Sequence, residues 1–215
     1  MSILPLFEGR LMREYHKINT IFKRDQQGKL LIGQYSMPEL EYLADNVWQF
    51  TEKIDGTNIR IMWDGQRVTY GGKTDNAQIP AFLVTRLQEL FTADKFAIWN
   101  APVCLYGEGY GAKIQKAGIN YKPDGTDFIL FDVWINGWWL KWDDVIDVAN
   151  KMEIHHVPVI GEGTLSNAID LTQTGFNSTF GGFIAEGLVI KPIVDLFCRN
   201  GERIIAKIKH KDFIR

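Results

Sequence analysis

Three strand-like segments that carry lysines constrain the fold of this chain more than any other feature. The first is Thr51-Glu-Lys-Ile-Asp-Gly-Thr-Asn58, which apolar residues flank on both sides. The second runs from Glu186 to Lys191, and the third is Lys207-Ile-Lys209. Three lysine-bearing strands in a chain of 215 residues indicate a pocket for a polyanionic ligand.

Lys53 is the candidate nucleophile of the first segment. An ordinary lysine has a pKa near 10.4, so freeing its lone pair at neutral pH costs about 4 kcal/mol. A lysine that is partly desolvated, or that lies beside other cations, needs less than that. The alternative is a solvated lysine ahead of a hairpin, which would be the better interpretation of Lys-x-Asp-Gly if the segment stood alone.

The other two segments indicate how lysines would meet phosphate. Lys207 and Lys209 are two residues apart, so they share one face of a strand while their apolar neighbours face the core. Two such ammonium groups repel unless an anion lies between them, and a triphosphate would supply it. The alternative is an edge strand protected by lysines. Glu186 and Lys191 are five apart, which places them on opposite faces of a regular strand, so both reach one ligand only near the end of that strand.

Local patterns predict both helices and hairpins. Asp64-Gly65 between two apolar runs is a strong hairpin signal. Pro80 begins a stretch whose apolar residues repeat at the helical period, and Asp143 is expected to cap a second helix. We expect His155 and His156 in a loop, and we expect residues 1–45 to pack onto a core domain of residues 46–215.

The segment Gly107-Glu-Gly-Tyr-Gly-Ala112 matches the dinucleotide fingerprint G-x-G-x-x-[GA] in spacing alone. Such a turn must open a helix in a βαβ unit, whereas the following residues are interrupted by Gly118 and stopped by Pro123. We therefore reject a dinucleotide-binding fold for this chain.

A nearly continuous apolar run at 128–134 contains a single acid, Asp132. Burying a carboxylate without partners costs several kcal/mol, so we expect a group that compensates its charge. The alternative to a ligand site here is a core residue, Phe131, beside a satisfied aspartate.

Charge excludes a global attraction to nucleic acid, because the formal net charge is −2. Any such contact needs a local patch, and residues 203–215 supply one in which five basic residues accompany only Asp212. Lys17, Lys23 and Arg24 are further candidates for phosphate contacts, although exposed charges are more often simply solvated.

The remaining composition favours an intracellular protein. Cys104 and Cys198 both lie in apolar runs, where we expect buried free thiols rather than a disulfide. Four histidines without clustered cysteines give no zinc signature, so a metal would be a hard ion held by carboxylate and phosphate. No signal peptide and no apolar run approaching 18 residues is present, so we expect a soluble, cytoplasmic protein.

In this order, the segments resemble the covalent nucleotidyltransferase superfamily, which contains ATP-dependent RNA and DNA ligases and GTP-dependent capping enzymes. Glu52-Lys-Ile-Asp-Gly-Thr-Asn58 looks closest to the RNA ligases of the phage and RNA-editing branch. Asp55 stands where many members of that branch have histidine, and Lys73 where many relatives have arginine. The resemblance implies an α+β fold: an ATP-grasp-like ligase adenylation domain with antiparallel sheets flanked by helices, and no OB-fold domain.

The resemblance also implies a mechanism in three steps. Lys53 would attack the α-phosphate of ATP and become lysyl-AMP, AMP would pass to an RNA 5′-phosphate, and a 3′-hydroxyl would displace AMP to seal the strand. The implied catalytic residues are Lys53, Asp55, Glu186, Lys207 and Lys209. The implied metal is Mg²⁺ or Mn²⁺, bound by Glu186 and Asp55. The implied nucleotide contacts are Glu52, Ile54, Asn58, Lys73, Glu108, Phe131, Asp132 and Lys191, with Phe131 stacking on the purine and Glu108, in a loop after a strand, meeting the ribose.

The implied partners are ATP and RNA ends, nicked or single-stranded, without a membrane. We expect a monomer, in the host cytoplasm if the chain is phage-encoded. The alternatives are a minimal DNA ligase, a GTP-dependent capping enzyme, or a module that binds nucleotide or RNA without catalysis.

Overall fold

The computed structural model describes residues 14–214, and these fold into two compact units. Unit 1 comprises the described residues before His16 together with Asp55–His156. Unit 2 comprises His16–Ile54 and the described residues from Val157 onward. Both units combine helices with mainly antiparallel sheets, so the class is α+β, as predicted. The predicted boundary after residue 45 stays a prediction.

Unit 1 is a sheet covered by helices. Its strand order is β10-β8-β7-β5-β6, with β9 paired to β8. Helices α2 and α5 contribute Leu83, Leu87, Val145 and Ala149 to the same buried cluster as the sheet residues Ile59 and Leu130. The strands of this unit are β5 (Thr57–Trp63), β6 (Val68–Gly71), β7 (Val103–Gly111), β8 (Thr126–Ile135), β9 (Trp138–Trp139) and β10 (His155–His156). Its helices are α2 (Ala81–Leu90), α3 (Ala93–Phe96), α4 (Gly118–Tyr121) and α5 (Trp142–Met152).

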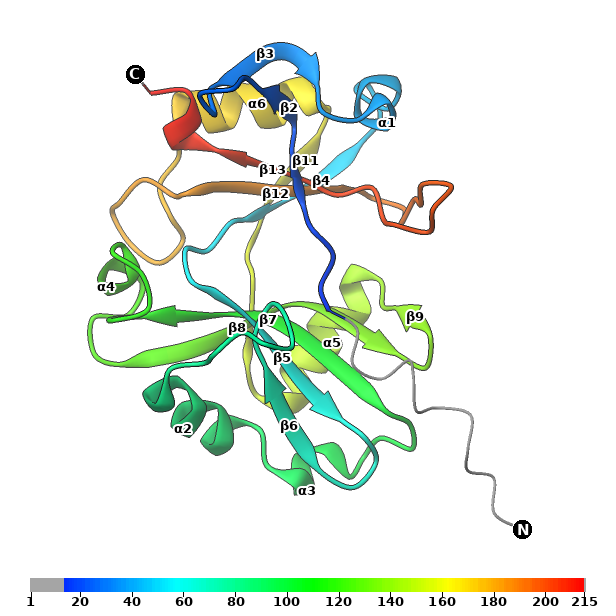
Figure 1. Ribbon diagram of the computed structural model, residues 1–215, viewed down its shortest axis with the longest axis vertical. Helices are drawn as coiled ribbons and strands as arrows, with labels where there is room; N and C mark the ends of the chain where they lie inside the picture. The colour runs from blue at the N-terminus through cyan, green and yellow to red at the C-terminus, as the bar shows by residue number, and fades with distance from the viewer. Residues whose placement is uncertain (1–13, 215) are drawn as a thin grey trace. The chain divides into compact units, whose positions relative to one another are not determined.

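Unit 2 is built on a five-stranded sheet with the order β1-β13-β12-β4-β11 (Figure 1). All of its pairings are antiparallel except the parallel pair of β1 and β13. The strands are β1 (Asn19–Thr20), β4 (Trp48–Glu52), β11 (Val159–Gly163), β12 (Gly187–Pro192) and β13 (Ala206–Lys209). A separate hairpin pairs β2 (Phe22–Arg24) with β3 (Leu30–Tyr35). The helices are α1 (Pro38–Tyr42), α6 (Leu165–Thr174) and the short 3-10 helix η1 (His210–Asp212).

Some of the predicted helices, strands and turns are confirmed, and others are corrected. The hairpin at Asp64-Gly65 is confirmed by the pairing of β5 with β6, and the helix after Pro80 is confirmed as α2. The helix at 142–152 also forms, but its N-cap is Lys141 rather than Asp143, which lies in the first turn. His155 and His156 form the short strand β10 beside β8 instead of a loop, because parallel pairing satisfies their backbone groups.

Between residues 14 and 214, no helix is both long enough and apolar enough to cross a membrane.

Candidate functional site

One face of the sheet in unit 2 is apolar and the other carries lysines. Residues alternate along β12 and β13, so Leu188, Ile190, Ala206 and Ile208 join the buried cluster. The intervening residues of the same strands include Lys191, Lys207 and Lys209, all half-buried. Register pairs Val189 with Lys207 and with Thr51, so β4 presents its alternate residues on this same face. The predicted orientation of Lys207 and Lys209 is therefore confirmed.

Glu186 bridges two lysines at the edge of this face. Lys53 follows β4 directly, and its Nζ donates a hydrogen bond of 2.6 Å to Oε2 of Glu186. The Nζ of Lys209 lies 2.6 Å from Oε1 of the same carboxylate. The side chains of Lys53, Glu186 and Lys209 are 19%, 13% and 22% exposed, so the network is reachable from solvent but largely desolvated. One carboxylate thus holds two ammonium groups that would otherwise repel.

The backbone around Gly187 makes this bridge possible. Gly187 has φ +150°, and a Cβ at this position would lie 2.0 Å from the carbonyl oxygen of Ile208. That oxygen belongs to the paired strand β13, so only glycine fits. The carbonyl oxygen of Gly187 accepts from the backbone N–H of Lys53 at 2.9 Å. Glu186 lies just before β12 and not within it. The rule that residues five apart on a strand point to opposite faces therefore does not fix the direction of its side chain relative to Lys191.

Glu52 is a buried anchor next to Lys53. Its side chain is almost inaccessible, with the residue 1% exposed, and its carboxylate accepts three hydrogen bonds. The donors are the hydroxyl of Ser178 at 2.6 Å, and the backbone N–H and hydroxyl of Thr179 at 3.0 and 2.7 Å. Ile54, on the other side of Lys53, is 3% exposed. The residues that flank the lysine are therefore fixed by packing and by a segment 126 residues away in sequence.

In unit 1, Asp132 has the partner that its burial requires. Asp132 is 2% exposed, and the hydroxyl of Tyr15 donates a hydrogen bond of 2.8 Å to its Oδ2. The ring of Tyr15 also meets Phe131 edge-on, with centroids 5.1 Å apart. Sequence reasoning missed Tyr15, which lies 117 residues from Asp132.

Phe131 lies at an irregularity in the sheet. Tyr106 pairs with Asp132 and Gly107 pairs with Leu130, so Phe131 is an extra residue on β8. Such a bulge redirects a side chain relative to its neighbours. Phe131 is half-buried, unlike the fully buried residues on either side of it. A ring in this position remains partly accessible.

Asn58 and Glu108 are paired neighbours on β5 and β7. Glu108 lies within β7 and not in a loop, which corrects the expectation from the resemblance. Gly107 is needed there for close packing rather than for a turn, because a Cβ would lie 2.2 Å from the ring of Phe128. The Oδ1 of Asn58 is buried without a hydrogen-bond partner among the described residues. An orphaned acceptor costs about 1–3 kcal/mol, so a donor on a bound ligand would relieve it.

Arg60 organises the turn that carries Lys73. Arg60 is 1% exposed on β5, and its Nε donates to the carbonyl oxygen of Gly72 at 2.8 Å. Its Nη2 donates to Asp75 at 2.8 Å. Lys73 itself is exposed between these two partners. Sequence reasoning missed Arg60, although an arginine inside an apolar strand signals a buried cation that needs partners.

Metal-binding residues do not cluster in the part of the chain that the structure describes, where no group of three or more histidine, cysteine or acidic residues could hold an ion. The two expected ligands belong to different units, Asp55 to unit 1 and Glu186 to unit 2. The carboxylate of Glu186 is a hard oxygen ligand of the kind that Mg²⁺ and Mn²⁺ accept. The donor chemistry of that residue suits such an ion, and both of its oxygens lie 2.6 Å from a lysine nitrogen in this structure.

Neither thiol is activated as a nucleophile, because burial raises the pKa of both Cys104 and Cys198. Cys104 and Cys198 are both free, and Cys104 is fully buried as expected, whereas Cys198 is half-buried. Burial raises the pKa of the Cys104 thiol to about 12, so it is not ionised near neutral pH. Lysine is then the better candidate for covalent chemistry.

A family model described as RNA ligase matches residues 46–209 of the chain. The chain belongs to the RNA ligase family. The matched region contains all of the lysine-bearing segments described above, from Lys53 to Lys209.

This RNA ligase family member also has a fold similar to that of solved Naegleria gruberi RNA ligase structures. A variant with ATP and Mn is 16% identical, with a TM-score of 0.69, and the match covers 94% of this chain and 59% of that one. A second variant with ATP and Mn is 17% identical, with a TM-score of 0.66 and coverages of 89% and 57%. The structure with PPi is 18% identical, with a TM-score of 0.64 and coverages of 91% and 61%. The chain thus spans less than two thirds of the length of these relatives.

Proposed function

We propose that this chain is an ATP-dependent RNA ligase that acts through a covalent AMP on Lys53. The observation that carries the proposal is the pair of 2.6 Å contacts by which Glu186 holds Lys53 and Lys209 together. An ammonium group has no lone pair, so a proton must leave Lys53 before it can attack phosphorus. The carboxylate of Glu186 is hydrogen-bonded to that nitrogen and is the group suited to take the proton.

The first step forms a bond between Nζ of Lys53 and the α-phosphorus of ATP and breaks the bond to the β-phosphate oxygen, so pyrophosphate leaves. Lys191, Lys207 and Lys209 neutralise phosphate charge, because phosphoryl transfer depends on positioning and electrostatics. Asp55 and Glu186 are the residues that we assign as ligands of Mg²⁺ or Mn²⁺, and such an ion would supply further charge neutralisation.

We also propose nucleotide contacts for the other candidates. Phe131 stacks on the purine, a contact worth about 1–3 kcal/mol, and Asp132 supports the reacting region. Asn58 offers its orphaned Oδ1 to a ribose hydroxyl beside Glu108. The remaining assigned contacts to the nucleotide are Glu52, Ile54 and Lys73. For Glu52, the three hydrogen bonds to Ser178 and Thr179 support a role in positioning Lys53.

In the following two steps, AMP passes to the 5′-phosphate of an RNA end, and a 3′-hydroxyl then attacks that activated phosphate and releases AMP. The α+β fold and its likeness to structures with ATP and Mn support the finer assignment of a nucleotidyltransferase adenylation domain. We propose that this domain comprises residues 46–215, with residues 1–45 packed onto it. We further propose that it forms lysyl-AMP by itself and as a monomer, which light scattering of the purified chain would check.

The test is incubation of the purified chain with ATP and Mg²⁺, followed by intact mass measurement. The expected result is a gain of one AMP, abolished in Lys53→Ala and kept in the control Lys29→Ala, which removes an exposed lysine of unit 2. A folded chain that gains no AMP contradicts the proposal. An adduct with GTP but not ATP would instead favour a capping enzyme. Nicks with RNA or DNA on the 3′-hydroxyl side distinguish RNA from DNA ligation, because only RNA offers a 2′-hydroxyl.

A further inference from the structure

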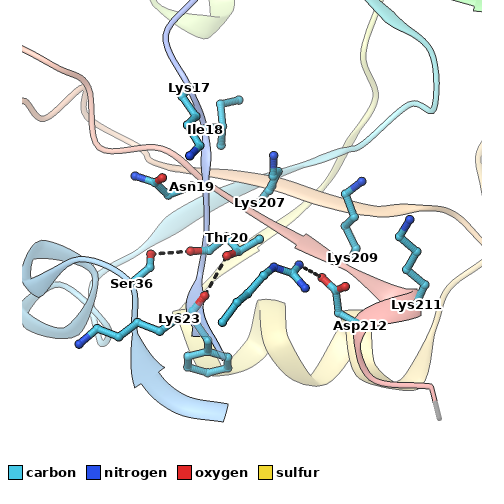
Figure 2. A pocket seen from close by; sticks show the side chains of 12 residues that line it. Lys17, Ile18, Asn19, Thr20, Lys23, Ser36, Lys207, Lys209, Lys211 and Asp212 are labelled. Carbon is cyan, nitrogen blue, oxygen red and sulfur yellow. Dashed lines mark hydrogen bonds and ion pairs between the residues drawn. The ribbon is translucent and has the colours of Figure 1, made fainter. Parts of the chain in front are cut away.

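A basic groove of about 720 Å³ lies in unit 2 beside the lysine face (Figure 2). It is lined by residues of β1, β2, β13 and η1. Its basic side chains are Lys17, Lys23, Arg24, Lys207, Lys209 and Lys211, and among the residues that the structure describes Asp212 is the only acidic one in the lining. Six cations facing one carboxylate are unusual in a chain whose net charge is −2. The groove therefore concentrates positive charge that the rest of the chain lacks.

Only part of this charge is compensated within the protein. Arg24 pairs with Asp212 at 2.6 Å, and Lys209 pairs with Glu186 at 2.6 Å. Lys17, Lys23 and Lys211 are exposed and form no ion pair with any residue that the structure describes. These three lysines lie outside the three lysine-bearing segments, and they are available to an anionic ligand.

The arrangement of the cations favours an extended anion. Figure 2 shows the side chains of Lys207, Lys209 and Lys211 projecting to the same side. Lys207 and Lys209 are two apart on β13, which separates their backbones by about 6.6 Å, and Lys211 follows in η1, so the three charges are spread along the chain and not gathered at one point. Asn19, Thr20 and Ser36 add uncharged polar groups to the lining. Such a mixture of lysines and small polar side chains is typical of contacts to a phosphate and sugar backbone.

We propose that this groove binds the phosphodiester backbone of the RNA strand to be joined, through Lys17, Lys23 and Lys211. The inference rests on the proposed RNA ligase function and adds the path of the RNA. Lys209 lines the groove and also contacts Glu186, which contacts Lys53, so two ion pairs within unit 2 connect the groove to the candidate nucleophile. Contacts of this kind are independent of base sequence and weaken with salt, because bound cations on the RNA are released.

The test separates RNA binding from chemistry. The variant is the triple substitution Lys17→Ala, Lys23→Ala and Lys211→Ala. The matched control, Lys29→Ala, Lys116→Ala and Lys141→Ala, removes three exposed lysines that do not line the groove. Binding of a 5′-phosphorylated, fluorescein-labelled single-stranded RNA is measured by anisotropy across a salt series. The groove variant should bind about 10- to 100-fold more weakly at low salt, and its slope of log affinity against log salt should shrink by about 2.

Formation of lysyl-AMP from ATP should stay within about twofold of the parent chain in both variants. Equal RNA affinity and equal salt slope in the groove variant and the control would overturn the proposal. A second arm measures reversal of lysyl-AMP by pyrophosphate. If only this reversal is impaired, the groove holds pyrophosphate and the RNA assignment is wrong. If the parent chain binds RNA in the groove but forms no lysyl-AMP, the proposed function fails while the groove assignment stands.

Discussion

Replacing Glu186 with glutamine should slow lysyl-AMP formation without unfolding the protein. In the parent chain, Oε2 accepts a hydrogen bond from Lys53 at 2.6 Å, and Oε1 forms an ion pair of 2.6 Å with Lys209. Glutamine has nearly the same shape, but one of its two terminal atoms is an N–H₂ group that donates instead of accepting. One ammonium group would then face a donor, and both would lose the compensating negative charge. Lys53 and Lys209 would move apart.

The magnitude follows from the bond that is lost. A hydrogen bond to a charged group contributes about 1.5–3 kcal/mol, and the side chains here are about one fifth exposed or less, so little of that is screened by solvent. If 2–3 kcal/mol of this interaction positions Lys53 for attack, the rate should fall by about 30- to 160-fold. The effect should fall on the rate of the first step, because Glu186 would act on the nucleophile.

Single-turnover labelling with ATP that carries radioactive α-phosphate measures that rate directly. Glu162→Gln is the matched control, because Glu162 is exposed on β11 of the same unit. Thermal denaturation of each variant establishes that it is folded. A folded Glu186→Gln protein that labels within about threefold of the parent would refute the reasoning that Glu186 positions Lys53.

Four further predictions concern the framework and the two thiols. Glu52→Ala removes the acceptor of three hydrogen bonds and should lower the free energy of unfolding by at least about 2 kcal/mol in urea denaturation. Gly56→Ala places a Cβ 2.3 Å from a backbone oxygen of β7 and should cost about 1–3 kcal/mol, whereas Gly182→Ala enters open space and should be neutral. Native protein at pH 8 should react with iodoacetamide at Cys198 but not at Cys104. Because the folded state raises the pKa of Cys104 from 9.0 to about 12, the unfolded chain loses this proton first, and stability should fall as pH rises through that window.

Local chemistry in the sequence was sufficient to predict the faces of the strands. Alternation between apolar residues and lysines at 206–209 predicts which side chains join the core, and both Ala206 and Ile208 are buried. The aspartate and glycine at 64–65 predict a hairpin because few residue pairs adopt such a turn. These features depend on neighbours within a few positions, which a sequence displays directly.

Hydrogen-bond partners that lie far apart in the chain could not be predicted from local sequence patterns. The need for a group beside Asp132 follows from its apolar surroundings, but the identity of Tyr15 depends on a contact across 117 residues. In the same way, Glu52 finds Ser178 and Thr179 in a turn-rich segment that no local pattern connects to β4. A sequence indicates that a buried charge must be satisfied, and only the fold selects the donor.

The lysine face and the core of unit 2 are two consequences of one register. Residues of β12 and β13 alternate, so a slip of one position would bring Lys207 into the apolar cluster and expose Ile208. The slipped register would bury an ammonium group among apolar side chains, which is far more costly than losing one methyl contact. The apolar residues therefore fix the register that keeps the lysines on the other face. Substitutions at Ala206 or Ile208 should for this reason impair the proposed adenylylation as well as stability, although both side chains lie on the apolar face of the sheet, opposite the lysines.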